Sequence, residues 1–190
     1  MTGQSGGDPA SDAGRVDVSL GSMPHAAELV LDSYRAHHRA LYAFLVSAIR
    51  DPEAAADLLQ ESYLRLLREV RAGRVPADAR AWLYRVAGNL AISRGRRRRS
   101  AERWLPWLVP HDTVSSPEAD LMLREDQRHV AAQLANLPPD GRIALLMAAH
   151  GFNGAEIARA LGRSDVATRS LLFRARTTLR ERLEPTDMDR

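Results

Sequence analysis

Residues 154–162, GAEIARALG, decide how the C-terminal part of this chain folds. Ile157 and Leu161 lie four residues apart, so on a helix both face the same side and can enter a core. The small side chain of Ala158 allows a second helix to cross closely, and Gly162 can adopt the positive φ that a tight turn requires. The segment therefore predicts a helix, a short turn after Gly162 and a second helix.

The second helix begins after Ser164, a typical N-cap residue, and is expected to run to about Leu183. Its inner face carries Thr168, Leu172, Ala175, Leu179 and Leu183, and its outer face carries Asp165, Arg169, Arg176 and Arg180. A helix-turn-helix places the N-terminal part of its second helix in the major groove of DNA, with flanking arginines on phosphates. An ordinary helical hairpin is the alternative interpretation of this pattern.

The cationic side chains are all arginine, and they are concentrated in two segments. The 190-residue chain has 27 basic and 24 acidic residues, a formal net charge of +3. Residues 94–103, RGRRRRSAER, carry a net charge of +5, residues 155–183 carry +4, and the remainder carries −6. Two basic segments in an otherwise acidic chain indicate contact with a polyanion.

The composition excludes several classes of function. The lack of Lys excludes a Schiff-base enzyme and a Walker-type phosphate loop, and the lack of Cys excludes disulfides, thiol nucleophiles and Cys-based zinc sites. The six His show no metal-binding spacing, so we predict no catalytic residue, no metal and no cofactor. No apolar run is long enough for a membrane span and no secretory signal is present, so we expect a soluble cytoplasmic protein.

The periodicity before the helix-turn-helix is also helical, and no segment alternates as a strand would. Asp51-Pro52 starts one helix, Gly73 and Pro76 open a loop, and a further helix runs into the arginine cluster. We therefore expect an all-α fold of two small helical domains joined by a flexible linker. The expected divisions are a disordered tail over 1–22, a first domain over 23–99, a linker over 100–117, a helix-turn-helix domain over 118–184 and a tail over 185–190.

Two surfaces of the first domain are candidates for binding. The first surface is a polar face around an exposed leucine, formed by Asp57, Gln60, Glu61, Leu64 and Arg68. Such a face suits docking to a partner helix, although a plain solvated face is the commoner case. The second surface combines Trp82, Tyr84, Arg85 and Asn89 with the arginine cluster that follows. Aromatic rings beside a basic patch suit opened DNA, although Trp82 can equally be a core residue and the cluster a solvated helix end.

Three segments together resemble the extracytoplasmic-function (ECF) group of sigma factors of bacterial RNA polymerase. Residues 57–65, DLLQESYLR, resemble the helix that binds core polymerase. Residues 81–92, AWLYRVAGNLAI, with the arginines after them, resemble the promoter-melting and "minus ten" helix. Residues 137–183 resemble the "minus thirty-five" domain. The chain departs from the usual family pattern at Gly88, Thr168 and Leu171.

The resemblance implies a role for each matching position. Core-polymerase binding is assigned to Asp57, Gln60, Glu61, Leu64 and Arg68. Promoter melting and minus-ten binding are assigned to Arg74, Trp82, Arg85, Asn89, Arg96, Arg97, Arg98 and Arg99. Minus-thirty-five binding is assigned to Arg163, Ser164, Asp165, Ala167, Thr168, Arg169, Arg174 and Arg176.

The function that follows is that of a non-catalytic alternative sigma factor, which binds core RNA polymerase and directs promoter recognition and opening. Its expected partners are core polymerase, promoter DNA as duplex and as melted non-template strand, and an anti-sigma factor, which is common in the family. A helix-turn-helix regulator that binds duplex DNA without polymerase is the main alternative. A helical adaptor with no DNA role is a third class, and it predicts binding that is insensitive to salt.

Overall fold

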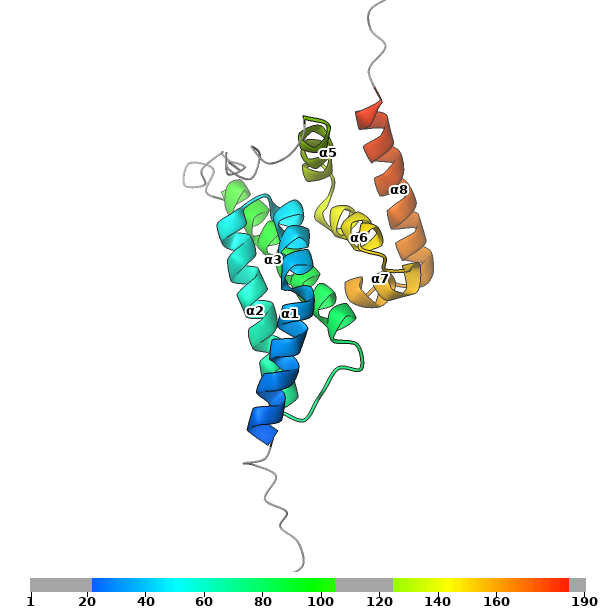
Figure 1. Ribbon diagram of the computed structural model, residues 1–190. Coiled ribbons are helices and arrows are strands. Elements are labelled where there is room, and N and C mark those ends of the chain that lie inside the picture. The colour runs from blue at the N-terminus through cyan, green and yellow to red at the C-terminus, as the bar shows by residue number, and fades with distance from the viewer. Residues whose placement is uncertain (1–21, 105–124, 185–190) are drawn as a thin grey trace, which may run out of the picture.

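The computed structural model describes residues 22–104 and 125–184, and the described residues that have regular structure are all helical (Figure 1). The helices are α1 (Ser22–Ile49), α2 (Pro52–Arg71), α3 (Ala79–Trp104), α5 (Glu125–Ala135), α6 (Pro139–Ala149), α7 (Gly154–Leu161) and α8 (Asp165–Leu183). Within these ranges no helix combines the length and apolar character needed to cross a bilayer.

Helices α1, α2 and α3 form the first unit. The turn between α1 and α2 follows the predicted chemistry: Oδ1 of Asp51 accepts a hydrogen bond from the Ala54 amide at 2.9 Å, and Pro52 opens α2. The three helices bury a common core whose largest fully buried side chains are Leu41, Phe44, Leu45, Leu66, Leu83 and Tyr84. Tyr84, predicted to be a base-stacking ring, is therefore a core residue, and that part of the prediction is wrong.

Helices α5 to α8 form the second unit, and the turn at its centre is built as the sequence predicts. Asn153 and Glu156 form a reciprocal capping box at the start of α7. Gly162 ends α7 in the left-handed conformation, with φ 63° and ψ 38°, and the Ser164 hydroxyl accepts a hydrogen bond from the Ala167 amide at 3.2 Å. Ile157 and Leu172 are buried, so the two helices of the motif share a core.

The two units pack directly against each other. Helix α3 contacts α1 and α2 on one side and α6 and α7 on the other, while α8 packs on α6 and α7 (Figure 1). As a result, one cluster of buried residues runs through both units, from Phe44 and Tyr84 to Ile143, Met147 and Phe152. The sequence predicts two domains, and the structure adds that their cores are continuous.

Some predicted boundaries differ from the structure. Helix α3 continues to Trp104, five residues beyond the expected end of the first domain at residue 99, because 100–104 extend the same helix instead of starting a linker. Residues 105–124, and with them most of the expected linker and the predicted helix start near Ser116, lie outside the described residues, as do 1–21 and 185–190.

Candidate docking and nucleic-acid surfaces

The predicted docking face of α2 is accessible. Asp57, Gln60 and Arg68 are exposed, and Leu64 keeps 39% of its surface in contact with solvent. Glu61 is half-buried and bonded within its own helix, because its Oε1 accepts from Nε of Arg65 at 2.8 Å. This hydrogen bond is the largest influence lowering the pKa of Glu61, so its carboxylate is ionised at neutral pH, where it pairs with Arg65 and Arg68.

An apolar groove between α1 and α2 adjoins this face. Its volume is about 370 Å³, and it is lined by Val30, Tyr34, Ala56, Leu59, Gln60, Tyr63, Leu64 and Leu67. The sequence does not predict this groove, because Tyr34 has the helical spacing of residues that enter the core. In the structure Tyr34 is 43% exposed, and its ring stacks on His38 with the centroids 4.6 Å apart. The exposed Leu31 on the same helix gives a sequence signal, since it lies off the buried stripe.

The first half of α3 offers a smaller aromatic surface than expected. Trp82 is half-buried, and the Arg85 guanidinium lies 6.0 Å from the centroid of its ring. Asn89 is exposed two turns further along the helix. In the loop before α3, Nε and Nη2 of Arg74 donate to the two carboxylate oxygens of Glu69, at 2.8 and 2.9 Å. This bidentate pair connects the loop to the end of α2.

The second half of α3 presents the arginine cluster. Arg96, Arg97 and Arg99 are exposed, and Arg98 is half-buried. Arg94, by contrast, forms an ion pair with Asp51 at 3.3 Å and so ties α3 to the start of α2. The exposed members can follow a phosphate backbone, which is the main source of affinity for nucleic acid.

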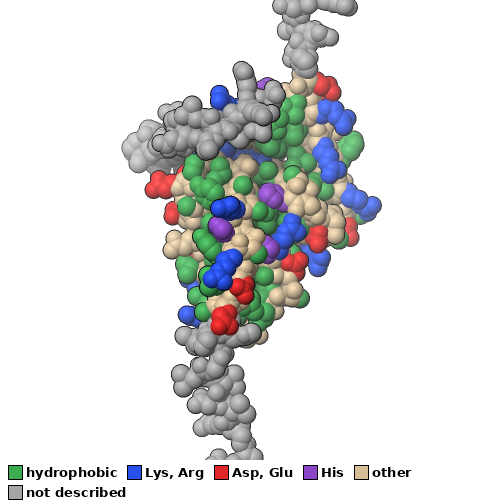
Figure 2. All heavy atoms as spheres, in the orientation of Figure 1, with side chains coloured by type: hydrophobic (Ala, Val, Ile, Leu, Met, Phe, Trp, Pro, Cys, Tyr) green, Lys and Arg blue, Asp and Glu red, His purple; other side chains and the backbone are tan. Residues whose placement is uncertain are grey.

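The outward face of α8 differs in part from the predicted one. Ser164, Asp165, Arg169, Arg174 and Arg176 are exposed as expected, and Ala167 is half-buried. Figure 2 shows arginines along the edge of the molecule where α8 lies. The prediction that Thr168 contacts DNA is wrong, because this residue is fully buried.

Two large apolar residues lie on the exposed face of α8, where Thr168 was expected to contact DNA. Val166 is 66% exposed and Phe173 is 71% exposed, and with Arg169 they follow the spacing of one helical face. Sequence reasoning could have found them, since both lie off the inner stripe of Thr168, Leu172 and Ala175.

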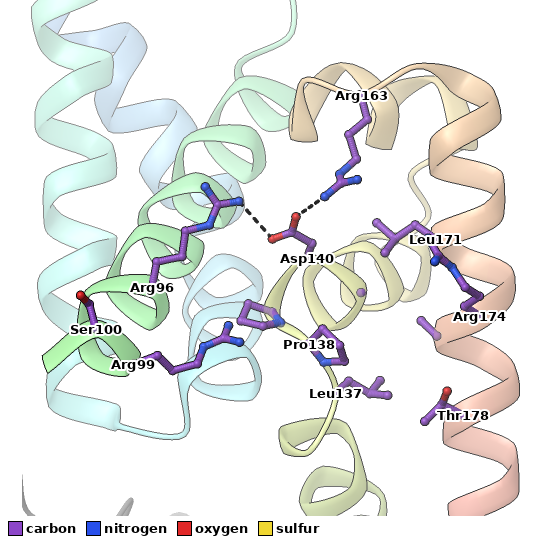
Figure 3. A pocket seen from close by; sticks show the side chains of 13 residues that line it. Arg96, Arg99, Ser100, Leu137, Pro138, Asp140, Arg163, Leu171, Arg174 and Thr178 are labelled. Atoms are coloured by element: carbon purple, nitrogen blue, oxygen red, sulfur yellow. Dashed lines mark hydrogen bonds and ion pairs between the residues drawn. The ribbon is translucent and has the colours of Figure 1, made fainter. Parts of the chain in front are cut away.

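The two basic surfaces meet at one acidic side chain. Asp140, in the first turn of α6, accepts from Nη2 of Arg163, and its other carboxylate oxygen lies 3.6 Å from Nη2 of Arg96 (Figure 3). Asp140 is 20% exposed. It borders a pocket of about 790 Å³ between α3 and α8, which Arg99 and Arg174 also line.

A half-buried arginine near this junction also binds the ends of neighbouring helices. The Arg142 guanidinium donates to the carbonyl oxygens of Ala48 at 2.6 Å, Ala135 at 2.9 Å and Leu137 at 3.2 Å. Burial, followed by repulsion from Arg99, lowers the pKa of Arg142. Across the described part of the chain, no group of three or more His, Asp or Glu could hold a metal ion.

Comparisons with known proteins agree with this arrangement. Residues 33–101 match the family described as Sigma-70 region 2, and residues 127–179 match Sigma-70, region 4. The chain is 33% identical to the ECF RNA polymerase sigma factor SigG of Mycobacterium tuberculosis, over 98% of this chain and 53% of that protein. It is 30% identical to a probable RNA polymerase sigma-C factor of Mycobacterium bovis, over 84% of this chain and 92% of that protein. The chain thus spans about half the length of the first relative and most of the second.

A solved structure shows the same fold. The sigma factor RpoE from Bartonella quintana, crystallised in complex with the anti-sigma factor NepR, superimposes with a TM-score of 0.67 at 23% identity, covering 82% of this chain and 96% of that one. Region 2 corresponds to the unit that carries the α2 face and the arginine cluster, and region 4 to the unit that carries the helix-turn-helix. From both regions, in this order, and from these relatives it follows that the chain belongs to the family of ECF sigma factors.

Proposed function

We propose that this protein is a non-catalytic sigma factor that binds core RNA polymerase and directs it to promoters. The observation that carries the proposal is the presence of regions 2 and 4 on one chain, with accessible docking and basic surfaces on them. We also propose that it acts in the cytoplasm, where polymerase works. An anti-sigma factor is a further expected partner, since the similar RpoE chain was crystallised with one.

The docking site for polymerase is the α2 face together with the adjoining groove. Gln60 and Leu64 belong to both, so a partner helix that covers the face also fills the groove. Burying the exposed leucine and tyrosine surface there would supply apolar free energy, and the charges of Asp57 and Arg68 would set the orientation.

The promoter surfaces are α3 and α8. Trp82 and Asn89 face opened DNA, and the exposed arginines that follow bind its backbone. On α8, Arg169 and the exposed Val166 and Phe173 enter the major groove, where the apolar side chains can contact thymine methyl groups.

Run-off transcription tests the function. The full chain, mixed with core polymerase on promoter fragments selected by the holoenzyme from genomic DNA, should yield defined transcripts that core polymerase alone does not. If the protein is instead a regulator that binds duplex DNA without polymerase, the protein alone should bind an operator tightly and should not co-purify with polymerase subunits.

Two double variants separate polymerase binding from promoter opening. Gln60→Ala with Leu64→Ala should weaken binding to core polymerase roughly tenfold, a loss of about 1.4 kcal/mol. Arg97→Glu with Arg98→Glu should leave core binding within about twofold but weaken open-complex formation, because it reverses two charges beside the backbone. Arg35→Glu with Arg39→Glu, on exposed positions of α1, is the charge-matched control. Equal losses of both double variants in both assays would contradict this division of roles.

A further inference from the structure

The pocket beside Asp140 is formed mainly by the second unit. Ten of its thirteen lining residues belong to α6, to the residues just before it, to the turn after α7 and to α8, and the other three belong to α3. At its inner wall α6 packs closely on α8, because a Cβ placed on Gly141 would lie 3.3 Å from Cβ of Ala175. The volume of about 790 Å³ lies within the range of roughly 300–1,000 Å³ that is typical of small-molecule sites.

The charged side chains of this pocket favour an anion. Four arginines and one aspartate line it, so its net charge is +3. Asp140 pairs with Arg96 and Arg163. Within the described residues, Arg99 and Arg174 are paired with no carboxylate, and Nε of each donates to a carbonyl oxygen of its own helix, at 3.5 and 3.3 Å respectively. The terminal N–H groups of these two arginines are therefore available to bind phosphate oxygens in the forked geometry that guanidinium groups favour.

The rest of the pocket is apolar. Leu171 points from α8 toward α6, and it is one of the positions at which the chain departs from the usual family pattern (Figure 3). The other apolar lining residues are Leu137, Pro138, Pro139 and Ala175. The pocket thus offers cations, an apolar wall and one carboxylate that can accept a hydrogen bond. An inorganic anion would use only the first of these three features.

We propose that this pocket binds a purine nucleoside triphosphate. Arg99 and Arg174 bind the triphosphate chain, the flat base lies against Leu171 and the prolines, and the carboxylate of Asp140 accepts a hydrogen bond from a ribose hydroxyl group, as acidic residues do in other nucleotide sites. The volume leaves room for a two-ring base. The proposal goes beyond the proposed function, because this binding needs neither polymerase nor promoter DNA.

Calorimetric titration of the full chain tests the proposal, at low salt and without divalent metal ions. ATP and GTP are the nucleotide probes, and inorganic tripolyphosphate carries a similar chain of phosphates without a nucleoside. At least one nucleotide should bind one molecule per chain with a dissociation constant of about 0.1 mM or lower, and about fivefold or more tightly than tripolyphosphate. Failure of both nucleotides to bind would overturn the proposal. Binding of both no tighter than that of tripolyphosphate would show a general attraction of polyanions to arginine and would also overturn it.

A charge-matched pair of variants tests whether the phosphates lie in this pocket. Arg174→Gln should weaken the binding of the nucleotide and of tripolyphosphate about fivefold or more, because it removes charge-assisted hydrogen bonds to phosphate. Arg159→Gln makes the same change in net charge at an exposed position of α7 outside the pocket, and should leave both affinities within about twofold. Equal losses in the two variants would place the phosphates elsewhere and contradict the proposal.

A second pair of variants tests the position of the base. Leu171→Ala should weaken nucleotide binding about fivefold and leave tripolyphosphate binding within about twofold, because it removes apolar surface that only the base contacts. Leu179→Ala, which truncates another half-buried leucine of α8 outside this pocket, should leave both affinities within about twofold. Equal effects of the two leucine variants on nucleotide binding would overturn the placement of the base against Leu171.

Discussion

His150 is the residue most sensitive to pH at the contact between the two units. Burial, followed by repulsion from Arg80, lowers its pKa below the ordinary value of 6.5. Its neutral ring packs beside Phe44 and Tyr84, and Arg80 binds the carbonyl of the same residue. Protonation would therefore place a second positive charge next to a guanidinium in a partly buried site.

The expected consequence is a loss of stability in mild acid. Because the unfolded chain takes up the proton more readily than the folded chain, the contribution of His150 is fully present above pH 6.5 and is lost as the pH falls from 6.5 through the lower folded-state pKa. His150→Gln keeps an acceptor for Tyr84 without the titration, so its unfolding free energy should fall less between pH 7 and pH 5. Urea unfolding across this range measures the difference, and identical pH profiles would exclude this role.

At the scale of the element, the turn between α7 and α8 depends on one backbone conformation. Gly162→Ala should lower the free energy of unfolding by about 1–2 kcal/mol, because φ 63° is a left-handed conformation that alanine adopts at that cost. Gly154→Ala is the control: this glycine starts α7 with no positive φ, and a Cβ there meets nothing within 4 Å. Thermal unfolding of both variants would measure the effect, and equal midpoints would contradict it.

The sequence predicts several ends of the helices correctly, but it does not predict every residue that the helices bury. Asp51, Ser164 and Gly162 act locally, so their residue types predicted caps and a turn that the structure confirms. Whether Tyr34 lies in a core or a groove depends on what packs across it, and the periodicity of one helix does not contain that information. Thr168 was correctly placed on the inner face by its spacing, and only the resemblance assigned it to DNA.

At the scale of the whole molecule, the continuous core predicts cooperative unfolding. Buried residues of α3 and α7 belong to one cluster, so opening either unit exposes apolar surface of the other. The most protected amides of α3 and α7 should therefore exchange with the same opening free energy when hydrogen exchange is followed at rising urea concentrations. Two distinct opening free energies would show that the units unfold independently.

The contact between α3 and the α6–α7 segment was not predictable from sequence for a related reason. From the sequence, Gly88 is only a residue that weakens a helix. The structure shows that its missing side chain leaves room for Ile143 of α6. Asp140 is a second example. From the sequence it is an acidic residue in the first turn of a helix, and only the structure shows that it pairs with both Arg96 and Arg163.

Because both faces of this contact belong to one chain, each meets the other at an effective concentration that covalent connection sets, on the order of millimolar for short tethers. A contact too weak to hold two separate molecules together would therefore still keep the two units of one chain together, and the core that they share adds to this preference.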